Sequence, residues 1–230
     1  NDTFGHFVDI TAEGNAIICS SLAYHVNGPG YVDFGANIWE QIGQNITGKV
    51  SGDWFGMSVS ITDDGEMIVV GAFLNNGLNG EGSGSAQVRI YHLDDNGMNW
   101  EQIGNNFDGN MAGDGLGFSV SLSANGTTVA IRAPGAAIIE IRTGQLGKNV
   151  YDDYDKDYFG HFVDTSSEGI TIAIGLPGIP GIPGYVEVFS LDVGDNLGHG
   201  NWKWKKIGQD ISGEMIGDGL SFSVSISDNG

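Results

Sequence analysis

The sequence predicts an all-β protein built from repeated four-stranded antiparallel units. Two observations support this fold class: a short phrase returns five times along the 230 residues, and 39 of those residues are glycine. Self-similarity at this scale indicates one supersecondary unit that is used repeatedly. Glycine at about one residue in six is typical of turns and close backbone approaches, and it disfavours a helical protein.

The first element of each unit is an opening strand. Small polar and apolar residues alternate in it, which is the period of a β-strand and not of a helix. Four copies begin with Phe-Gly or Leu-Gly, and the fifth begins with Leu-Ser. The copies start at Phe4, Phe55, Leu116, Phe159 and Leu220.

A tight turn follows each opening strand and predicts a hairpin. Asn-Gly and Asp-Gly between alternating segments favour this turn, since its central residues must tolerate positive φ. The turns are Glu13-Gly14, Asp64-Gly65, Asn125-Gly126, Glu168-Gly169 and Asn229-Gly230. The apolar segments 67–72, 128–133 and 170–175 are then the second strands.

The third and fourth strands follow a glycine-rich loop. Segments 86–91 and 185–189 are predicted third strands. The fourth strand carries Trp-x-x-Ile-Gly, and we expect it to be outermost, with its ring packed between neighbouring units. This motif begins at Trp39, Trp100 and Trp204, and the third unit lacks it.

Four antiparallel strands per unit, with no helix between them, indicate a β-propeller blade. We expect one repeat domain over 1–230, and part of a larger propeller or repeat array. The predicted blades are 1–51, 52–112, 113–155 and 156–216, and 217–230 is predicted to be the opening strand of a further blade.

The phrases resemble the FG-GAP repeat. Phe-Gly, Ser-Val-Ser, a turn and then Val-Gly-Ala-Phe (70–73) or Arg-Ala-Pro-Gly (132–135) carry the resemblance, which extends over the whole chain. That repeat builds the propeller of integrin α-subunits and of many secreted microbial and algal proteins, and Trp-x-x-Ile-Gly resembles the variant of the second group. The resemblance implies an extracellular or cell-surface location.

Many FG-GAP blades hold calcium in an Asp-x-Asp-x-Asp-Gly loop, and this sequence departs from that pattern. The short turns, such as 62–65, offer at most two carboxylates, whereas calcium takes six to eight oxygens. We therefore expect no cofactor from the family pattern. The remaining calcium candidate is the set Asp153, Asp155 and Asp157, although Lys156 opposes a cation and Tyr158 stands where the loop would need glycine. A solvated acidic segment is the alternative.

Three Asn-x-Thr sequons predict N-glycosylation of a eukaryotic secreted protein. The acceptors are Asn1, Asn45 and Asn125. Asn125 lies in a predicted hairpin turn and Asn45 lies just after a predicted outer strand, so a glycan could reach both.

Composition excludes several classes of protein. Net charge is −20, with 29 acidic and 9 basic residues, which disfavours nucleic acid as a partner because phosphate binding requires clustered Lys and Arg. No segment has the apolar length of a membrane span, so we expect no membrane insertion. The single cysteine, Cys19, permits no intrachain disulfide and is expected to be a small buried hydrophobe.

The sequence therefore predicts a non-catalytic structural or recognition protein. Rigid acidic faces and variable loops would contact protein or glycan partners, and self-association into a fibre or coat is open because an open blade face needs a partner. The alternative is a propeller enzyme of the glycosidase or lyase kind, or attachment to a catalytic domain outside this segment. An enzyme of this kind needs ionisable groups on the inner strands, and the predicted inner strands offer only a few. These are Asp9, Asp164, His6 and His161.

Overall fold

All regular structure in the described residues is β-strand, which confirms the all-β prediction. The computed structural model describes residues 2–23, 31–36, 40–49, 52–74, 86–109, 115–133, 139–142, 145–146, 162–178, 181, 183–192, 203–216, 220 and 223–230. The chain divides into two compact units, Asn1–Leu122 and Ser123–Gly230. The Asp153, Asp155, Asp157 candidate and the Asn1 sequon lie outside the described residues.

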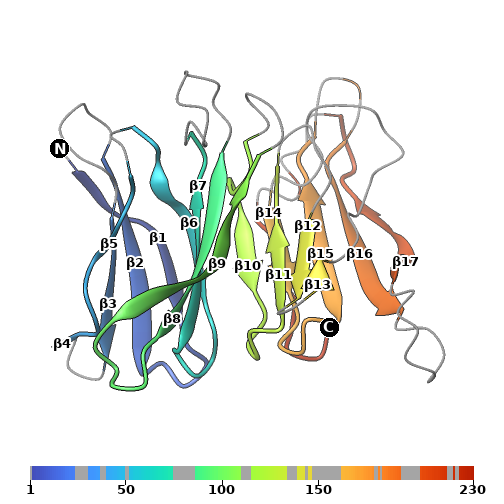
Figure 1. The fold of residues 1–230 in the computed structure, drawn as a ribbon. Coiled ribbons are helices and arrows are strands. Elements are labelled where there is room, and N and C mark those ends of the chain that lie inside the picture. The colour runs from blue at the N-terminus through green and yellow to red at the C-terminus, as the bar shows by residue number, and fades with distance from the viewer. Residues whose placement is uncertain are drawn as a thin grey trace. The chain divides into compact units, whose positions relative to one another are not determined.

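The first sheet has the order β1-β2-β3-β4, with β5 also paired to β3 (Figure 1). Its strands are β1 (Asp2–Ile10), β2 (Ala16–Ala23), β3 (Tyr31–Ala36), β4 (Glu40–Gln41) and β5 (Ile46–Thr47). The second sheet has the order β6-β7-β8-β9. Its strands are β6 (Phe55–Ile61), β7 (Met67–Ala72), β8 (Gln87–Leu93) and β9 (Trp100–Asp108).

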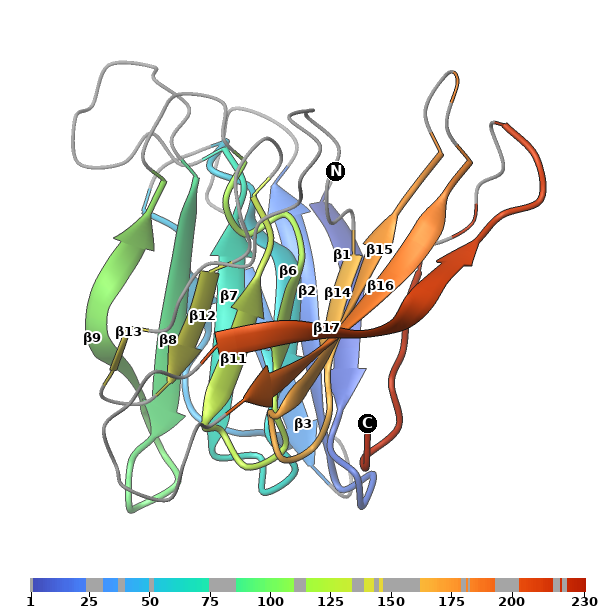
Figure 2. The ribbon, with the colours of Figure 1, turned by 90° about the vertical axis from the view of Figure 1, so that its right-hand side faces the viewer.

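Two further sheets repeat the same strand order. The third contains β10 (Val120–Leu122), β11 (Thr128–Ile131), β12 (Ile139–Arg142) and β13 (Gln145–Leu146). The fourth contains β14 (Phe162–Thr165), β15 (Thr171–Leu176), β16 (Tyr185–Asp192) and β17 (Lys203–Ser212), and Figure 2 shows β14 to β17 side by side. These four-stranded antiparallel sheets agree with the predicted propeller blades.

In the first unit, the core lies between the first and second sheets. Strands β1 and β2 pack against β6, and the buried cluster joins Ile18 of the first sheet to Phe55, Val59 and Ile68 of the second. Apolar burial of this kind contributes about 25 cal/mol per Å². Apolar residues on one sheet thus cover the neighbouring sheet, which explains why the opening strands alternate.

The Phe-Gly phrase forms a bulge in the opening strand. The register between β1 and β2 shifts between Phe4 and Val8, and that between β6 and β7 shifts between Phe55 and Ser58. The glycines sit at φ +74° in Gly5 and +87° in Gly56, where a side chain would be strained. The opening strand has two more residues than its partner across each shift, which bends the strand, and the positive φ favours glycine there.

The turns between first and second strands share one geometry. Each glycine donates its N–H to the carbonyl oxygen three residues earlier, over 2.8–3.0 Å. The five donors are Gly14, Gly65, Gly126, Gly169 and Gly230. The predicted hairpin turns therefore form, including the last one.

The fifth copy of the phrase forms its turn but no strand in the part that the structure describes. Residues 223–227 belong to no strand, while Gly230 N–H donates to Ser227 O over 2.9 Å. A strand is defined by its ladder, and no described strand pairs with this segment. The blade limits given above, including 217–230, stay predictions.

Candidate functional surface

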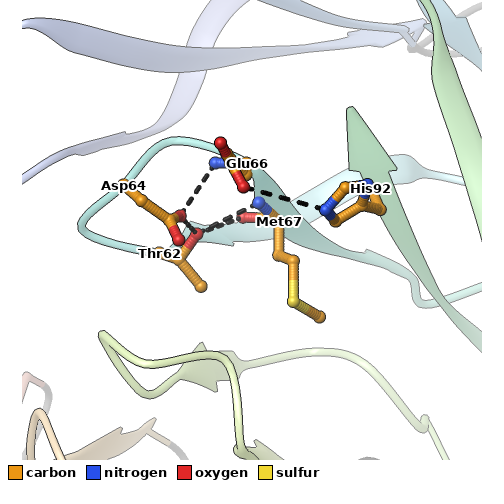
Figure 3. Close-up of polar contacts among 5 residues, drawn as sticks. All are labelled: Thr62, Asp64, Glu66, Met67 and His92. Atoms are coloured by element: carbon orange, nitrogen blue, oxygen red, sulfur yellow. Dashed lines mark hydrogen bonds and ion pairs between the residues drawn. The ribbon is translucent and has the colours of Figure 1, made fainter. Parts of the chain in front are cut away.

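The turn after β6 is fastened by its own side chains (Figure 3). Thr62 Oγ1 accepts the Met67 N–H over 3.0 Å and donates to Asp64 Oδ1 over 2.5 Å. The same carboxylate oxygen accepts the Glu66 N–H over 2.9 Å. His92 Nε2 lies 3.9 Å from Glu66 Oε2 at the exposed end of the hairpin. This network fixes the turn without any external ligand.

The same hydroxyl lock recurs in the other turns. Thr11 Oγ1, Ser123 Oγ and Ser166 Oγ each accept the N–H of the residue five positions later. Hydroxyl side chains at turn starts commonly satisfy backbone donors in this way. This hydrogen bond explains why Ser or Thr begins these four turns.

The donor set of these turns does not fit the calcium that the family pattern implies. Asp64 lies in the turn after β6, and its Oδ1 already accepts from Thr62 and Glu66. The matching amide in the third turn, Asn125, is engaged in the same manner with Ser123 and Thr127. Hard cations of this kind require several converging oxygens, and here the oxygens are turned onto the backbone.

The carboxylate of Asp9 joins two successive opening strands. Its Oδ1 accepts the Ile10 N–H over 2.9 Å, and its Oδ2 accepts the Ile61 N–H from β6 over 3.0 Å. Asp164 repeats the arrangement, accepting the Thr165 and Ile226 N–H groups over 3.0 and 2.8 Å. Both carboxylates, which are among the ionisable groups predicted on the inner strands, therefore accept backbone N–H groups.

In the second sheet, a serine stands at the position that Asp9 occupies in the first. Ser60 is the second-sheet counterpart of Asp9, and its hydroxyl accepts the Leu122 N–H over 3.1 Å. An opening strand thus donates one backbone N–H to a polar side chain of the opening strand before it. Buried N–H groups are expensive to leave unpaired, so this position requires an acceptor.

An outer-strand clasp joins the second sheet to the first. The indole Nε1–H of Trp100 donates to Ile42 O over 3.1 Å. The Gln44 amide accepts the Trp100 N–H over 2.8 Å and donates to Trp100 O over 3.0 Å, so it pairs as a neighbouring strand would. A Cβ on Gly43 would lie 2.7 Å from Trp100 Cδ1. The expected packing of a tryptophan against the neighbouring sheet is thus present at Trp100.

A side-chain pair bridges the glycine in the outer strands of the first, second and fourth sheets. Gln41 Nε2 donates to Asn45 Oδ1 over 2.6 Å, and Gln102 Nε2 donates to Asn106 Oδ1 over 2.9 Å. In β17 the corresponding pair is charged: Lys206 Nζ contacts Asp210 Oδ1 and also Glu187 Oε1 on β16. The hydrogen bonds that Lys206 donates, first to Asp210 and then to Glu187, raise the pKa of Lys206 above its usual range.

Substituting Lys206 by glutamine is expected to destabilise the fourth sheet by about 1–3 kcal/mol, because the buried Glu187 loses its cationic partner. The pKa of Lys206 is raised in the folded state. The charged side chain therefore stabilises the fold fully below the unfolded-state pKa of about 10.4, and this contribution is lost as pH rises through the raised folded-state pKa. Urea unfolding of both proteins at rising pH would measure the loss. Lys205→Gln, an exposed neighbour on β17, is the matched control, and equal effects of the two variants would contradict the assignment.

The structure describes two of the three sequon asparagines. Asn45 is exposed, and its Oδ1 accepts from Gln41. Asn125 is also exposed, and its Nδ2, the atom that would carry a glycan, donates to Glu168 O over 3.3 Å. Glycosylation at Asn1, Asn45 and Asn125, like calcium at Asp153, Asp155 and Asp157, stays a prediction.

A buried arginine on β8 was not anticipated from the sequence. The Arg89 guanidinium stacks on the Phe55 ring at 5.1 Å, and its Nε donates to Gln87 Oε1 over 2.7 Å. Burial raises the pKa of Tyr91, whose hydroxyl lies 3.5 Å from Arg89 Nη1. A cation over an aromatic face is favourable when desolvated. An arginine within a predicted third strand was the sequence signal for it.

The repeated four-stranded sheets, the Phe-Gly bulges and the clasp between outer strands define a repeat protein of β-propeller blades. Residues 48–89 match the family model of the FG-GAP repeat. This segment is therefore similar to the FG-GAP repeat, as the sequence motifs indicated. Among the described residues, no helix is long and apolar enough to cross a membrane.

The comparison with solved structures shows the same fold. Hydrazine synthase of Kuenenia stuttgartiensis is similar, with a TM-score of 0.53 and 18% identity over 80% of this chain. The match covers 45% of the hydrazine synthase chain, so the present chain spans less than half of that protein's length. At this identity the likeness concerns the propeller fold alone. No curated protein matches the chain.

Proposed function

We propose that this chain is a non-catalytic structural and recognition protein of the extracellular space or cell surface. Its blades present rigid acidic faces and loops to protein or glycan partners, and they serve as building blocks of a fibre or surface coat. The net charge of −20 supports a solvated surface that attracts basic partners. The occurrence of FG-GAP repeats in extracellular proteins supports the location.

The main support for this proposal is the hydrogen bonding of the polar side chains on the inner strands. In other propellers a central catalytic site would need carboxylates or histidines converging from inner strands. Here the Asp9 and Asp164 carboxylates each accept two backbone N–H groups. Within the described ranges, no group of three or more His, Cys, Asp or Glu side chains gathers as a metal site would require. Carboxylates that accept backbone N–H groups stabilise the fold, which supports a structural role for them over a catalytic one.

An array experiment tests the proposal against its enzymatic alternative. We expect the purified chain, labelled fluorescently, to bind members of an immobilised glycan and extracellular-protein array, with binding that persists when salt screens non-specific attraction. In parallel, a panel of soluble polysaccharides is incubated with the chain and assayed for new reducing ends and unsaturated products. Product release that Asp9→Asn or Asp164→Asn abolishes would overturn the proposal in favour of a glycosidase or lyase.

A further inference from the structure

Three aromatic side chains lie in contact at one end of the second sheet. The ring centroids of Trp54 and Phe73 are 5.9 Å apart, and those of Phe73 and Phe118 are 5.3 Å apart. Trp54 directly precedes β6 and Phe73 directly follows β7, and the pairing of Phe55 with Ala72 brings these two strand ends together. All three aromatic side chains are half-buried, so part of each reaches solvent. We call them the aromatic row.

Two members of the aromatic row replace residues that other copies of the repeat carry. Trp54 stands where the third copy has Gly115, since the carbonyl oxygen of each accepts the N–H of the residue three positions later. Phe73 stands where the third copy has Pro134 and the fourth has Pro177. Only the second copy thus combines two aromatic residues at places where other copies carry glycine and proline.

The backbone of Trp54 adopts a conformation that suits glycine better. Its φ is +51°, against +66° for Gly115 in the equivalent turn. In the described ranges Trp54 is the single non-glycine residue with positive φ, and a bulky side chain is strained there. Gly115 shows that glycine makes the same turn, so the fold alone does not account for the indole ring. Strain of this kind concentrates at ligand sites.

The carboxylate that precedes Trp54 is closed to a cationic ligand. Asp53 is 1% exposed, its Oδ2 accepts the Lys49 N–H over 2.9 Å, and its Oδ1 accepts the Phe55 N–H over 3.0 Å. A cation over the rings would lack the counter-charge of this carboxylate, whereas an uncharged ligand needs none. The surroundings of Trp54 therefore favour a neutral ligand.

The aromatic row is too small for a protein–protein interface. Each aromatic side chain has about 150–250 Å² of surface, so three that are largely covered leave on the order of 100 Å² open to solvent. A specific protein interface takes about 800 Å² from each partner. A six-membered sugar ring is similar in size to one aromatic ring, so one or two sugar rings would cover the row.

We propose that the aromatic row binds a neutral pyranose ring of a glycan. The face of an aromatic ring carries partial negative charge, and a pyranose with equatorial hydroxyl groups presents a flat face of positively polarised C–H groups. The sugar would stack on the exposed part of the rings, with Trp54 as the main contact. This inference rests on the recognition part of the proposed function and names its ligand class and site.

Isothermal titration calorimetry with cellotetraose and with chitotetraose tests the site. Both probes are uncharged chains of pyranose rings with equatorial hydroxyl groups, and the unsubstituted chain is expected to bind at least one of them. Trp54→Gly, which introduces the residue of the third copy, is expected to weaken binding by about tenfold or more. Phe73→Leu keeps an apolar side chain but removes a ring, and a similar loss is expected.

Phe107→Leu is the matched control, because Phe107 is a half-buried aromatic residue of the same sheet on β9. It is expected to bind the sugar as the unsubstituted chain does. Tryptophan emission provides a second readout: we expect it to shift to shorter wavelength on binding in the unsubstituted chain and in Phe107→Leu, but not in Trp54→Gly. Circular dichroism of each variant checks that the strands are retained.

Three outcomes would overturn the inference: neither sugar binds, Trp54→Gly binds as well as the unsubstituted chain, or Phe107→Leu loses binding equally. If neither sugar binds while an arrayed protein is captured only with Trp54 present, the aromatic row belongs to a protein partner instead. Array binding that persists in Trp54→Gly would leave the recognition role intact and remove only this site.

Discussion

Replacing Trp100 by alanine is expected to lower the free energy of unfolding of the first unit by about 3–5 kcal/mol. The ring is 4% exposed and belongs to the cluster between the first and second sheets. Its loss leaves a cavity over Gly43 and removes the indole donor from Ile42 O. Urea unfolding followed by circular dichroism would measure the change.

Trp100→Phe is the informative control for this substitution. Phenylalanine keeps an aromatic ring over Gly43 but cannot donate to Ile42 O, so about 1 kcal/mol of the hydrogen bond is lost together with some packing. If Trp100→Ala cost no more than Trp100→Phe, the ring would contribute nothing beyond its hydrogen bond. The clasp would then not be the contact that joins the outer strands.

Gly71→Ala is expected to be the second damaging change, at or above the usual 1–3 kcal/mol for overpacking. A Cβ on Gly71 would lie 2.1 Å from Gly117 O and 2.6 Å from Ser58 Oγ. The nearest atom is backbone, so no side-chain rotation relieves the clash. The Ser58 hydroxyl donates to the same Gly117 oxygen over 2.8 Å, which fixes the approach.

Gly97→Asn is the control for this glycine. Gly97 has φ +67° in the β8–β9 turn, with no described atom within 4 Å of an added Cβ. Asparagine tolerates that conformation better than most residues, so a change within about 1 kcal/mol is expected. Thermal unfolding of both variants would compare them, and equal melting temperatures would show that the approach of Gly71 to Gly117 is not tight.

Local patterns predicted most of the fold. The hairpin turns and the second strands β7, β11 and β15 follow from alternation and from glycine at fixed places, which depend on a few neighbouring residues. The first outer strand was only partly anticipated. It was expected over residues 39–43, whereas the structure has β4 at Glu40–Gln41 and a second short strand, β5, at Ile46–Thr47.

The contacts between sheets could not be read from the sequence. Gln44 lies 56 residues from Trp100, and Asp9 lies 52 residues from Ile61. Neither pair forms a motif, because each joins one repeat to the next and not neighbours within a repeat. The two backbone partners of the Asp9 carboxylate therefore could not be predicted from the sequence.

The clasp also bears on how a chain of this kind can lengthen. In the first unit, one sheet supplies the tryptophan and the preceding sheet supplies the glycine bulge and glutamine. A stretch of gene encoding a complete Trp-x-x-Ile-Gly-Gln blade, once copied in tandem, would insert a part whose two sides already match its neighbours. Blade number could then change by duplication without a compensating substitution elsewhere.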